Sequence, residues 1–298
     1  MSNTGFISRL QHFSTEDGRG IRTTVFLQGC NLHCIWCHNP ETLCGKGSLM
    51  LYDKLCGKCG LCAKVCENKA HTVDNGVHTY KRELCNLCGK CRDVCLNNAI
   101  VISGKKMTVD KVYDYIAEDT EFYAASGGGV TLSGGEPMLQ ADFCMQLAKK
   151  CKEENISVFI DTAADVGFDI LEQISKYTDE FMIDLKAHNE ADYKKYTGGS
   201  FYNVTENIKK LIQLGNNVLI RIPVIPMFND KHDDMEKYAD VMHSLGVKRV
   251  ELLPFHRLGS SKYKALGLDY AYSDTQPPED SVMTDMNKIL KQKGFEVL

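Results

Sequence analysis

The segment Gly29-Cys30-Asn31-Leu32-His33-Cys34-Ile35-Trp36-Cys37-His38-Asn39 organises the rest of the chain. Its three cysteines have a C-x3-C-x2-C spacing and come directly after a strand-like run at residues 23–27. Three thiolates can hold three irons of a [4Fe-4S] cluster, whereas full ligation by protein takes four. The fourth iron is then open to another ligand, much as a catalytic zinc keeps one coordination position free. We therefore interpret this segment as a site of chemistry rather than of electron storage.

Two simpler explanations of these cysteines compete with the open cluster. Their spacing of i, i+4, i+7 also fits one apolar face of a helix, and free cysteine is among the most buried residue types. A zinc knuckle is the second alternative, because histidines lie close by. The remaining cysteines of the chain favour the open cluster over both.

Length and composition narrow the classes of function. The 298 residues allow one large domain or two modest ones with a substantial core. A net charge of −4 argues against a nucleic-acid partner, since such binders neutralise phosphates. Residues 1–10 lack the apolar segment of a secretion signal, and no apolar run has membrane-spanning length. We expect a cytoplasmic protein with no membrane partner.

Fourteen cysteines are many for a reducing compartment, and twelve of them lie between Cys30 and Cys95. In an intracellular protein, clustered cysteines indicate metal ligands rather than disulfides. Cys44 belongs to no run, and we assign it no role. Cys144 and Cys151 are seven residues apart in a helical pattern, and we interpret them as core residues.

An internal repeat of cysteines follows the first segment. A C-x2-C-x2-C-x3-C run that starts at Cys56 recurs at Cys85, an offset of 85 − 56 = 29 residues. This is the bacterial ferredoxin arrangement, in which the fourth cysteine of each run ligates the other run's cluster. The expected ligand sets are Cys56, Cys59, Cys62 and Cys95 for one [4Fe-4S] cluster, and Cys85, Cys88, Cys91 and Cys66 for the other.

The proline that usually follows the fourth cysteine is replaced by Glu67 and Leu96. Structural zinc is the alternative here, and eight cysteines in two such runs disfavour it. We predict a ferredoxin-like domain at residues 48–103, with repeats at about 48–76 and 77–103.

The rest of the chain has the alternating pattern of an α/β protein. Six strands are expected at residues 23–27, 130–132, 158–161, 181–184, 218–222 and 249–253. Helices are expected at residues 109–119, 141–152, 168–177, 190–196, 202–214, 233–245 and 281–293. Alternation of this kind implies a parallel sheet with right-handed crossovers. We predict a partial (β/α)6 TIM-like barrel built from residues 1–47 and 104–298, with a doubly wound open sheet as the alternative.

Polar residues gather where the expected strands end, at the edge that carries the chemistry of barrel folds. They are Glu136, Asp161, Asp184, Arg221 and His256. Asp184 and Lys186 stand two apart at a strand end, so their side chains point the same way and suit a zwitterionic ligand. The alternative is a surface ion pair of little energetic value. His33, His71 and His78 belong to no motif and are assigned no role.

Gly134-Gly135-Glu136-Pro137 follows the strand at 130–132. Alone it is common turn material, and it is too short for a dinucleotide fingerprint. Beside an open cluster, bare backbone and a carboxylate can hold the ammonium group of an amino acid. With the C-x3-C-x2-C segment and Trp36 before its third cysteine, the chain resembles the radical S-adenosylmethionine (SAM) enzymes.

Further motifs resemble the activating enzymes of glycyl radical enzymes. They are Asp17-Gly-Arg-Gly-Ile-Arg22, Cys37-His-Asn-Pro-Glu41, Asp184-Leu-Lys186 and Leu253-Pro-Phe-His256. The pyruvate formate-lyase activating enzyme, the best-known member, lacks a ferredoxin insert. The insert makes this chain resemble the relatives that activate dehydratases, decarboxylases and C–N or C–S lyases.

The resemblance implies a role for each matching position. The catalytic cluster would be bound by Cys30, Cys34 and Cys37, and its free iron would chelate the amino and carboxylate groups of SAM. The implied SAM-binding positions are Gly134, Gly135 and Glu136 for the amino group, Trp36, Cys37 and His38 for adenine, and Asp184, Lys186 and His256 for the ribose and carboxylate. Asp161 and Thr162 match a monovalent-cation site to which Leu185 contributes its backbone. Asp17 would lie near the incoming peptide, and Arg221 is a weaker candidate.

The implied activity is the reductive cleavage of SAM to methionine and a 5′-deoxyadenosyl radical, which takes a hydrogen from a glycine of a partner glycyl radical enzyme. Three [4Fe-4S] clusters are implied, and the two extra ones would relay or gate electrons from flavodoxin or ferredoxin. One rival is a radical SAM enzyme that acts on a small molecule. The other is a ferredoxin-like electron carrier, which leaves the Gly-Gly-Glu and Asp-Leu-Lys motifs unexplained.

Overall fold

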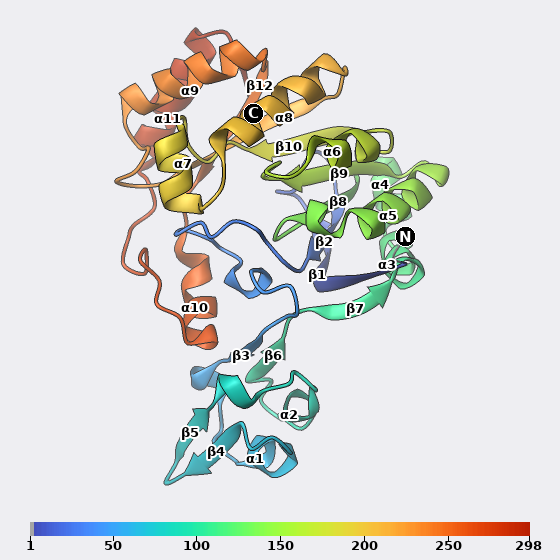
Figure 1. The fold of residues 1–298 in the computed structure, drawn as a ribbon, viewed down its shortest axis with the longest axis vertical. Helices are drawn as coiled ribbons and strands as arrows, with labels where there is room; N and C mark the ends of the chain where they lie inside the picture. The colour runs from blue at the N-terminus through green and yellow to red at the C-terminus, as the bar shows by residue number, and fades with distance from the viewer. Residues whose placement is uncertain (1–2) are drawn as a thin grey trace.

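The computed structural model describes residues 3–298 and is built around one nine-stranded sheet (Figure 1). The strand order is β13-β12-β11-β10-β9-β8-β2-β1-β7. Six adjacent strands run parallel: β2 (Arg22–Leu27), β8 (Gly129–Gly134), β9 (Ser157–Thr162), β10 (Glu180–Asp184), β11 (Val218–Val224) and β12 (Arg249–Pro254). The sequence predicted a mostly parallel α/β sheet that contains these six strands, and both predictions are confirmed.

The expected helices are also present. They are α3 (Val109–Ala117), α5 (Ala141–Glu153), α6 (Phe168–Ser175), α7 (Glu190–Thr197), α8 (Phe201–Gln213), α9 (His232–Leu245) and α11 (Asp280–Gln292). Two short helices were not predicted, α4 (Thr120–Ser126) and α10 (Ser260–Leu266). Short 3-10 helices are η1 (Pro40–Thr42), η2 (Asp53–Leu55), η3 (Arg82–Leu84), η4 (Pro137–Gln140) and η5 (Arg257–Gly259).

The crossover helices cover one face of the sheet. The buried apolar residues of α3, α5, α6, α8, α9 and α11 all belong to one apolar cluster with alternate residues of the strands. The intervening strand residues Phe159, Met182 and Leu219 form a separate small cluster on the other face. A doubly wound sheet would carry helices on both faces, so this distribution disfavours that alternative.

Three strands at or next to the edges of this sheet were not predicted. β1 (Thr4–Ser14) pairs antiparallel with β2, β7 (Lys105–Thr108) pairs antiparallel with β1, and β13 (Glu296–Val297) pairs parallel with β12. Many residues of β1 are only half-buried, including Ser8, Gln11 and His12. A half-exposed strand near the sheet edge lacks the apolar run on which the prediction relied.

Residues 49–102 form a small unit to one side of the large sheet (Figure 1). β3 (Leu49–Leu51) pairs antiparallel with β6 (Ile100–Ile102), and β4 (His71–Asp74) pairs antiparallel with β5 (Val77–Tyr80). The helices α1 (Leu61–Val65) and α2 (Lys90–Asp93) complete the unit. Its apolar cluster is separate from the main core, and the buried members are Leu49, Leu51, Cys91 and Ile100.

Three cysteines outside the motifs fit their assignments. Cys144 and Cys151 are fully buried within α5, which confirms the prediction that they belong to the core. Cys44 is exposed. Among the described helices, not one combines the length and the apolar character that crossing a membrane requires.

Candidate functional site

A cavity of about 470 Å³ opens at the carboxyl ends of the parallel strands. Most of its lining residues come from these strands or from the loops after them, as expected where parallel strands end at one edge, and Glu16 and Asp17 come from the loop before β2. Of the residues singled out from the sequence, it is lined by Asp17, Cys30, Cys34, Trp36, Cys37, His38, Gly134, Gly135, Asp161, Thr162, Asp184, Lys186, Arg221 and His256. Glu136 and Leu185 do not line it.

The three cysteines of the C-x3-C-x2-C segment lie on the loop after β2, and all are free thiols. Burial raises the pKa of Cys30 and Cys37 to about 11 and that of Cys34 to about 12. A buried thiolate is unfavourable by itself, whereas a bound metal ion deprotonates a coordinating thiol outright. Three such thiols around one cavity therefore fit a thiophilic metal cluster.

Gly134 and Gly135 bring bare backbone against this loop. Gly134 has a φ of +113°, in the region that favours glycine. A Cβ on Gly135 would lie 2.1 Å from the carbonyl oxygen of Gly29, so a larger residue fits only if the loop moves. The N–H of Glu136 donates to the same oxygen at 2.8 Å. The end of β8 is thus fixed directly to the start of the cysteine loop.

The carboxylate of Glu136 is fully buried behind the cavity wall. It accepts hydrogen bonds from the backbone N–H groups of Met138 and Ala163, each at 3.0 Å, and from the hydroxyl of Thr162 at 2.7 Å. Burial raises the pKa of this carboxyl to about 7, although these three donors oppose the rise. The side chain of Glu136 therefore connects the end of β8 to the end of β9.

Asp184 and Lys186 form an ion pair in the wall, with 2.7 Å between Nζ and Oδ2. Only 25% of the Asp184 side chain and 13% of the Lys186 side chain are exposed. Burial disfavours the charge on Lys186, but the nearby Asp184 and Cys34 outweigh it and raise the pKa of the ammonium group. The pair is a half-buried feature of the cavity rather than a surface ion pair. Between them, the buried Leu185 donates its N–H to the carbonyl of Arg221 at 2.9 Å.

Aromatic rings form another side of the cavity. Trp36 is buried and packs against Phe228 with 5.1 Å between ring centroids. His38 and His256 stack on each other at 3.7 Å. Burial and the neighbouring His256 lower the pKa of His38 to about 4, so the ring is neutral at neutral pH. Its buried Nε2 has no hydrogen-bond partner among residues 3–298, and a polar ligand could supply one.

A charged network completes the wall. Asp161 accepts a hydrogen bond from the hydroxyl of Ser133 at 2.6 Å and lies 3.7 Å from Nη1 of Arg221. Nε of Arg221 lies 3.1 Å from a carboxylate oxygen of Glu251. Burial raises the pKa of Asp161 to about 6, and the positive charge of Arg221 opposes that rise. Polar and charged groups of both signs therefore face the same space as the three thiols.

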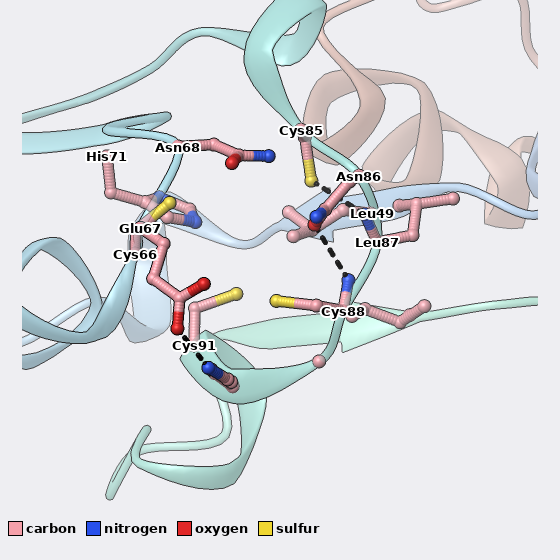
Figure 2. A pocket seen from close by; sticks show the side chains of 13 residues that line it. Leu49, Cys66, Glu67, Asn68, His71, Cys85, Asn86, Leu87, Cys88 and Cys91 are labelled. Atoms are coloured by element: carbon pink, nitrogen blue, oxygen red, sulfur yellow. Dashed lines mark hydrogen bonds and ion pairs between the residues drawn. The ribbon is translucent and has the colours of Figure 1, made fainter.

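Eight further cysteines gather around two smaller cavities. One of about 80 Å³ is lined by Cys66, Cys85, Cys88 and Cys91, and Figure 2 shows their sulfur atoms turned toward a common space. The other, of about 290 Å³, is lined by Cys56, Cys59, Cys62 and Cys95. These are the same two crossed sets that the ferredoxin spacing assigns.

Backbone donors point at several of these sulfur atoms. The N–H of Ala70 lies 3.2 Å from Sγ of Cys66, and the N–H of Ala99 lies 3.3 Å from Sγ of Cys95. The two contacts occur at equivalent positions of the repeat, although neither fourth cysteine is followed by proline. Hydrogen bonds to a charged form favour that form, so these donors suit thiolate ligands.

Lys262 of α10 is a residue that the sequence analysis missed. Its Nζ donates to Oδ1 of Asn39 at 2.8 Å and to Oε1 of Glu41 at 2.5 Å. From the other side, Arg82 donates to the backbone carbonyl of Ala265 at 2.7 Å. Helix α10 therefore connects the cysteine loop to the small unit. No sequence signal points to these contacts, because Lys262 and Glu41 are 221 residues apart in the chain.

Comparison with known proteins gives consistent matches. Residues 24–241 match the family model described as the radical SAM superfamily. The chain is 37% identical over 277 aligned positions to the (2S)-3-sulfopropanediol dehydratase activating enzyme of Klebsiella oxytoca, covering 90% of this chain and 87% of that one. It is 37% identical over 292 positions to the trans-4-hydroxy-L-proline dehydratase activating enzyme of Clostridioides difficile, covering 97% of each chain.

A third relative and a solved structure extend these matches. The benzylsuccinate synthase activating enzyme of Thauera aromatica is 38% identical over 301 aligned positions, covering 98% of this chain and 91% of that one. The crystal structure of a radical SAM methyltransferase from Sphaerobacter thermophilus aligns with a TM-score of 0.56 at 14% identity, covering 100% of this chain and 77% of that one. At that identity the structural likeness shows a shared fold.

Proposed function

Because this chain belongs to the radical SAM superfamily, and within it to the activating enzymes of glycyl radical enzymes, we propose that it introduces a glycyl radical into a partner protein. The observation that carries this proposal is that three thiols, a bare Gly-Gly backbone and a half-buried ion pair share one cavity. A reduced [4Fe-4S] cluster held there would supply the one electron needed to cleave SAM into methionine and a 5′-deoxyadenosyl radical, which would take a hydrogen atom from a glycine Cα and become 5′-deoxyadenosine.

The chain's own residues hold and orient the reactants. Cys30, Cys34 and Cys37 would hold the cluster, and a set of three would leave one iron for the amino and carboxylate groups of SAM. Gly134 and Gly135 bind the amino group, since a chain without side chains can approach it closely. Glu136 contributes through its backbone, because its carboxylate is engaged behind the wall.

Polar groups of the wall recognise the rest of SAM. Trp36, Cys37 and His38 contact the adenine, and the unpartnered Nε2 of His38 supports this role. Asp184, Lys186 and His256 hold the ribose and the carboxylate, because the ion pair offers both an acceptor and a donor. We also propose a monovalent cation near Asp161 and Thr162, with the backbone of Leu185 as a further ligand. Oδ1 of Asp161 supports this, since its nearest charged partner is 3.7 Å away.

The small unit supplies electrons in this proposal. Residues 48–103 form a ferredoxin-like domain of two repeats, about 48–76 and 77–103, each run of cysteines contributing three ligands to one cluster and one to the other. The domain is inserted into a core of residues 1–47 and 104–298, whose six parallel strands make a partial (β/α)6 barrel. The four-cysteine cavities and their backbone N–H donors support two clusters here. With the catalytic site, eleven cysteines hold three [4Fe-4S] clusters, and flavodoxin or ferredoxin is the electron donor.

The names of the relatives indicate the class of partner. They are activating enzymes of dehydratases, of a decarboxylase, of benzylsuccinate synthase and of lyases that cleave C–N or C–S bonds. We propose that the partner of this chain is a glycyl radical enzyme of this group. Its glycine-bearing loop would enter the cavity on the side of Asp17, which lines it.

The test is anaerobic incubation of the reconstituted protein with SAM, a reductant and candidate glycyl radical enzymes. Electron paramagnetic resonance (EPR) should detect an organic radical on one partner, and the radical should be absent when that partner's glycine is replaced by alanine. Cleavage of SAM without a radical on any candidate would favour a small-molecule substrate. Failure to cleave SAM at all, with clusters loaded, would favour the electron-carrier rival.

A further inference from the structure

His71 and His78, which belong to no motif, lie between the two four-cysteine cavities. His71 is buried and lines the cavity of Cys66 and Cys85 (Figure 2), whereas His78 lines the cavity of Cys56. Nδ1 of His71 lies 3.1 Å from Nε2 of His78, so one hydrogen bond joins the two rings. The pair forms a polar connection from one cysteine site to the other.

The internal repeat shows that packing at these positions does not require histidine. By the 29-residue offset, 78 − 49 = 29 and 100 − 71 = 29, so His78 corresponds to Leu49 and His71 to Ile100. The two strand pairs have equivalent registers. Leu49 lines the first cavity and Ile100 lines the second, so each cavity has one apolar residue and one histidine at related positions. The histidines therefore add a polar function to an arrangement that apolar residues can also build.

The hydrogen bonds of the pair have a direction. Nδ1 of His78 lies 3.3 Å from Sγ of Cys56, and a cysteine bound to iron is a thiolate with no proton to donate. The nitrogen that faces it therefore carries the proton and donates it. Nε2 of the neutral ring then accepts from Nδ1–H of His71. Nε2 of His71 is left bare, and it has no partner among the described residues.

If Nε2 of His78 carries the proton instead of Nδ1, the ring can still donate to a cysteine of the same set. Nε2 of His78 lies 3.6 Å from Sγ of Cys62, which belongs with Cys56. The pair thus directs an N–H donor to the set of Cys56, Cys59, Cys62 and Cys95. The opposite site has a different donor, the hydroxyl of Tyr80 beside Cys85.

We propose that His71 and His78 are positioning residues that raise the reduction potential of the cluster held by Cys56, Cys59, Cys62 and Cys95. Hydrogen bonds to the sulfurs stabilise the more negative, reduced cluster and are among the factors that set its potential. Because the opposite site has the Tyr80 hydroxyl instead, the two repeat-related clusters have different donors, and the histidine pair helps to set how the electron from the external donor distributes between them. This inference rests on the proposed function, because it needs a cluster in each cavity.

The test replaces the two histidines by the apolar residues that stand at the equivalent positions of the repeat. In the holoenzyme, H71I combined with H78L should leave about twelve irons per chain and lower the midpoint potential of one cluster in an EPR-monitored redox titration. We expect about a tenfold change in the equilibrium distribution of one electron between the two insert clusters. This corresponds to a shift in midpoint potential of about 59 mV for a one-electron couple. H78Q keeps an N–H donor and should retain most of the wild-type potential. The EPR signal that C59A lacks belongs to the cluster that Cys59 helps to hold, so this variant identifies the signal whose potential should change.

Each outcome decides the inference. Unchanged potentials in the double variant at full iron content would overturn it. Loss of about four irons from the double variant would overturn it too, because the histidines would then serve assembly rather than potential. Failure of the proposed function is distinguishable from both: wild-type protein without insert clusters would hold about four irons instead of about twelve, and a protein that only carries electrons would hold its insert clusters without cleaving SAM.

Discussion

The carbonyl oxygen of Gly29 lies 2.1 Å from the point that a Cβ on Gly135 would occupy. The loop that carries the three cysteines and the loop that ends β8 are therefore in backbone contact, and the N–H of Glu136 donates to the same carbonyl. The three cysteines and the proposed amino-group site are therefore positioned relative to each other by one contact between two glycines.

Gly135→Ala should displace the cysteine loop and reduce both SAM binding and loading of the catalytic cluster. Overpacking of this kind typically costs about 1–3 kcal/mol. Anaerobic iron analysis with SAM titration measures both effects, and the two insert clusters should remain. Gly45→Ala is the matched control, because a Cβ at Gly45 meets nothing within 4 Å. Wild-type SAM affinity in Gly135→Ala would show that the contact does not position the site.

Asp184→Ala or Lys186→Ala should weaken SAM binding without changing the iron content. Loss of a charged hydrogen-bonding group costs about 1.5–3 kcal/mol, or roughly ten- to a hundred-fold in affinity. The double variant should lose less than the sum of the two single losses, because the partners contact each other. Asp285→Ala is the control, since it disrupts an exposed pair with Lys288. Unchanged affinity in both single variants would remove the pair from the binding site.

The two kinds of cluster should fail independently. Cys34→Ala should abolish SAM cleavage and leave the insert clusters in place. Cys91→Ala should damage one insert cluster, keep cleavage with a strong chemical reductant and sharply reduce cleavage with flavodoxin or ferredoxin. Cys44→Ala is the control, because Cys44 is an exposed thiol outside the three ligand sets. Equal rates for Cys91→Ala and wild type with the protein donor would rule out an electron relay through the insert.

Glu136 should make stability depend on pH. Burial raises its pKa from 4.5 to about 7, so the folded protein holds a proton that the unfolded chain has released between these values. Its contribution to stability is fully present below pH 4.5 and is lost as the pH rises through about 7. Glu136→Gln should remove this dependence, with a difference of about 3 kcal/mol at most.

Denaturant unfolding from pH 4.5 to 7.5 measures this effect, with the exposed Glu153→Gln as the control. Parallel pH profiles for wild type and Glu136→Gln would contradict the assignment of a raised pKa to this carboxyl.

Much of this architecture follows from local sequence. Five of the six parallel strands are short apolar runs before a helical pattern, and β2 is a short run before the cysteine loop, so the strands and their parallel arrangement could be predicted. β1 could not, because half-buried polar residues such as Gln11 interrupt its apolar pattern. The cysteine sets followed from spacing alone, since ferredoxin ligation crosses between the runs in a fixed way.

Other parts of the site depend on contacts that the sequence does not encode locally. The Gly-Gly-Glu motif located the loop, but only the fold shows that the Glu136 carboxylate turns to Thr162 rather than to the cavity. The contact of Lys262 with the cysteine loop joins distant parts of the chain. His71 and His78 did leave a signal, because their repeat equivalents are apolar, but its meaning needed the 3.1 Å contact between the rings.

Transfer of a labelled hydrogen tests the central claim most directly. The partner glycyl radical enzyme is prepared with deuterium on the Cα of its glycines and incubated anaerobically with this protein, SAM and reductant. We predict that 5′-deoxyadenosine gains deuterium as the partner gains its radical signal, and that Cys34→Ala yields neither. Formation of 5′-deoxyadenosine without deuterium, in the presence of a partner that carries the radical, would contradict direct hydrogen abstraction from the glycine.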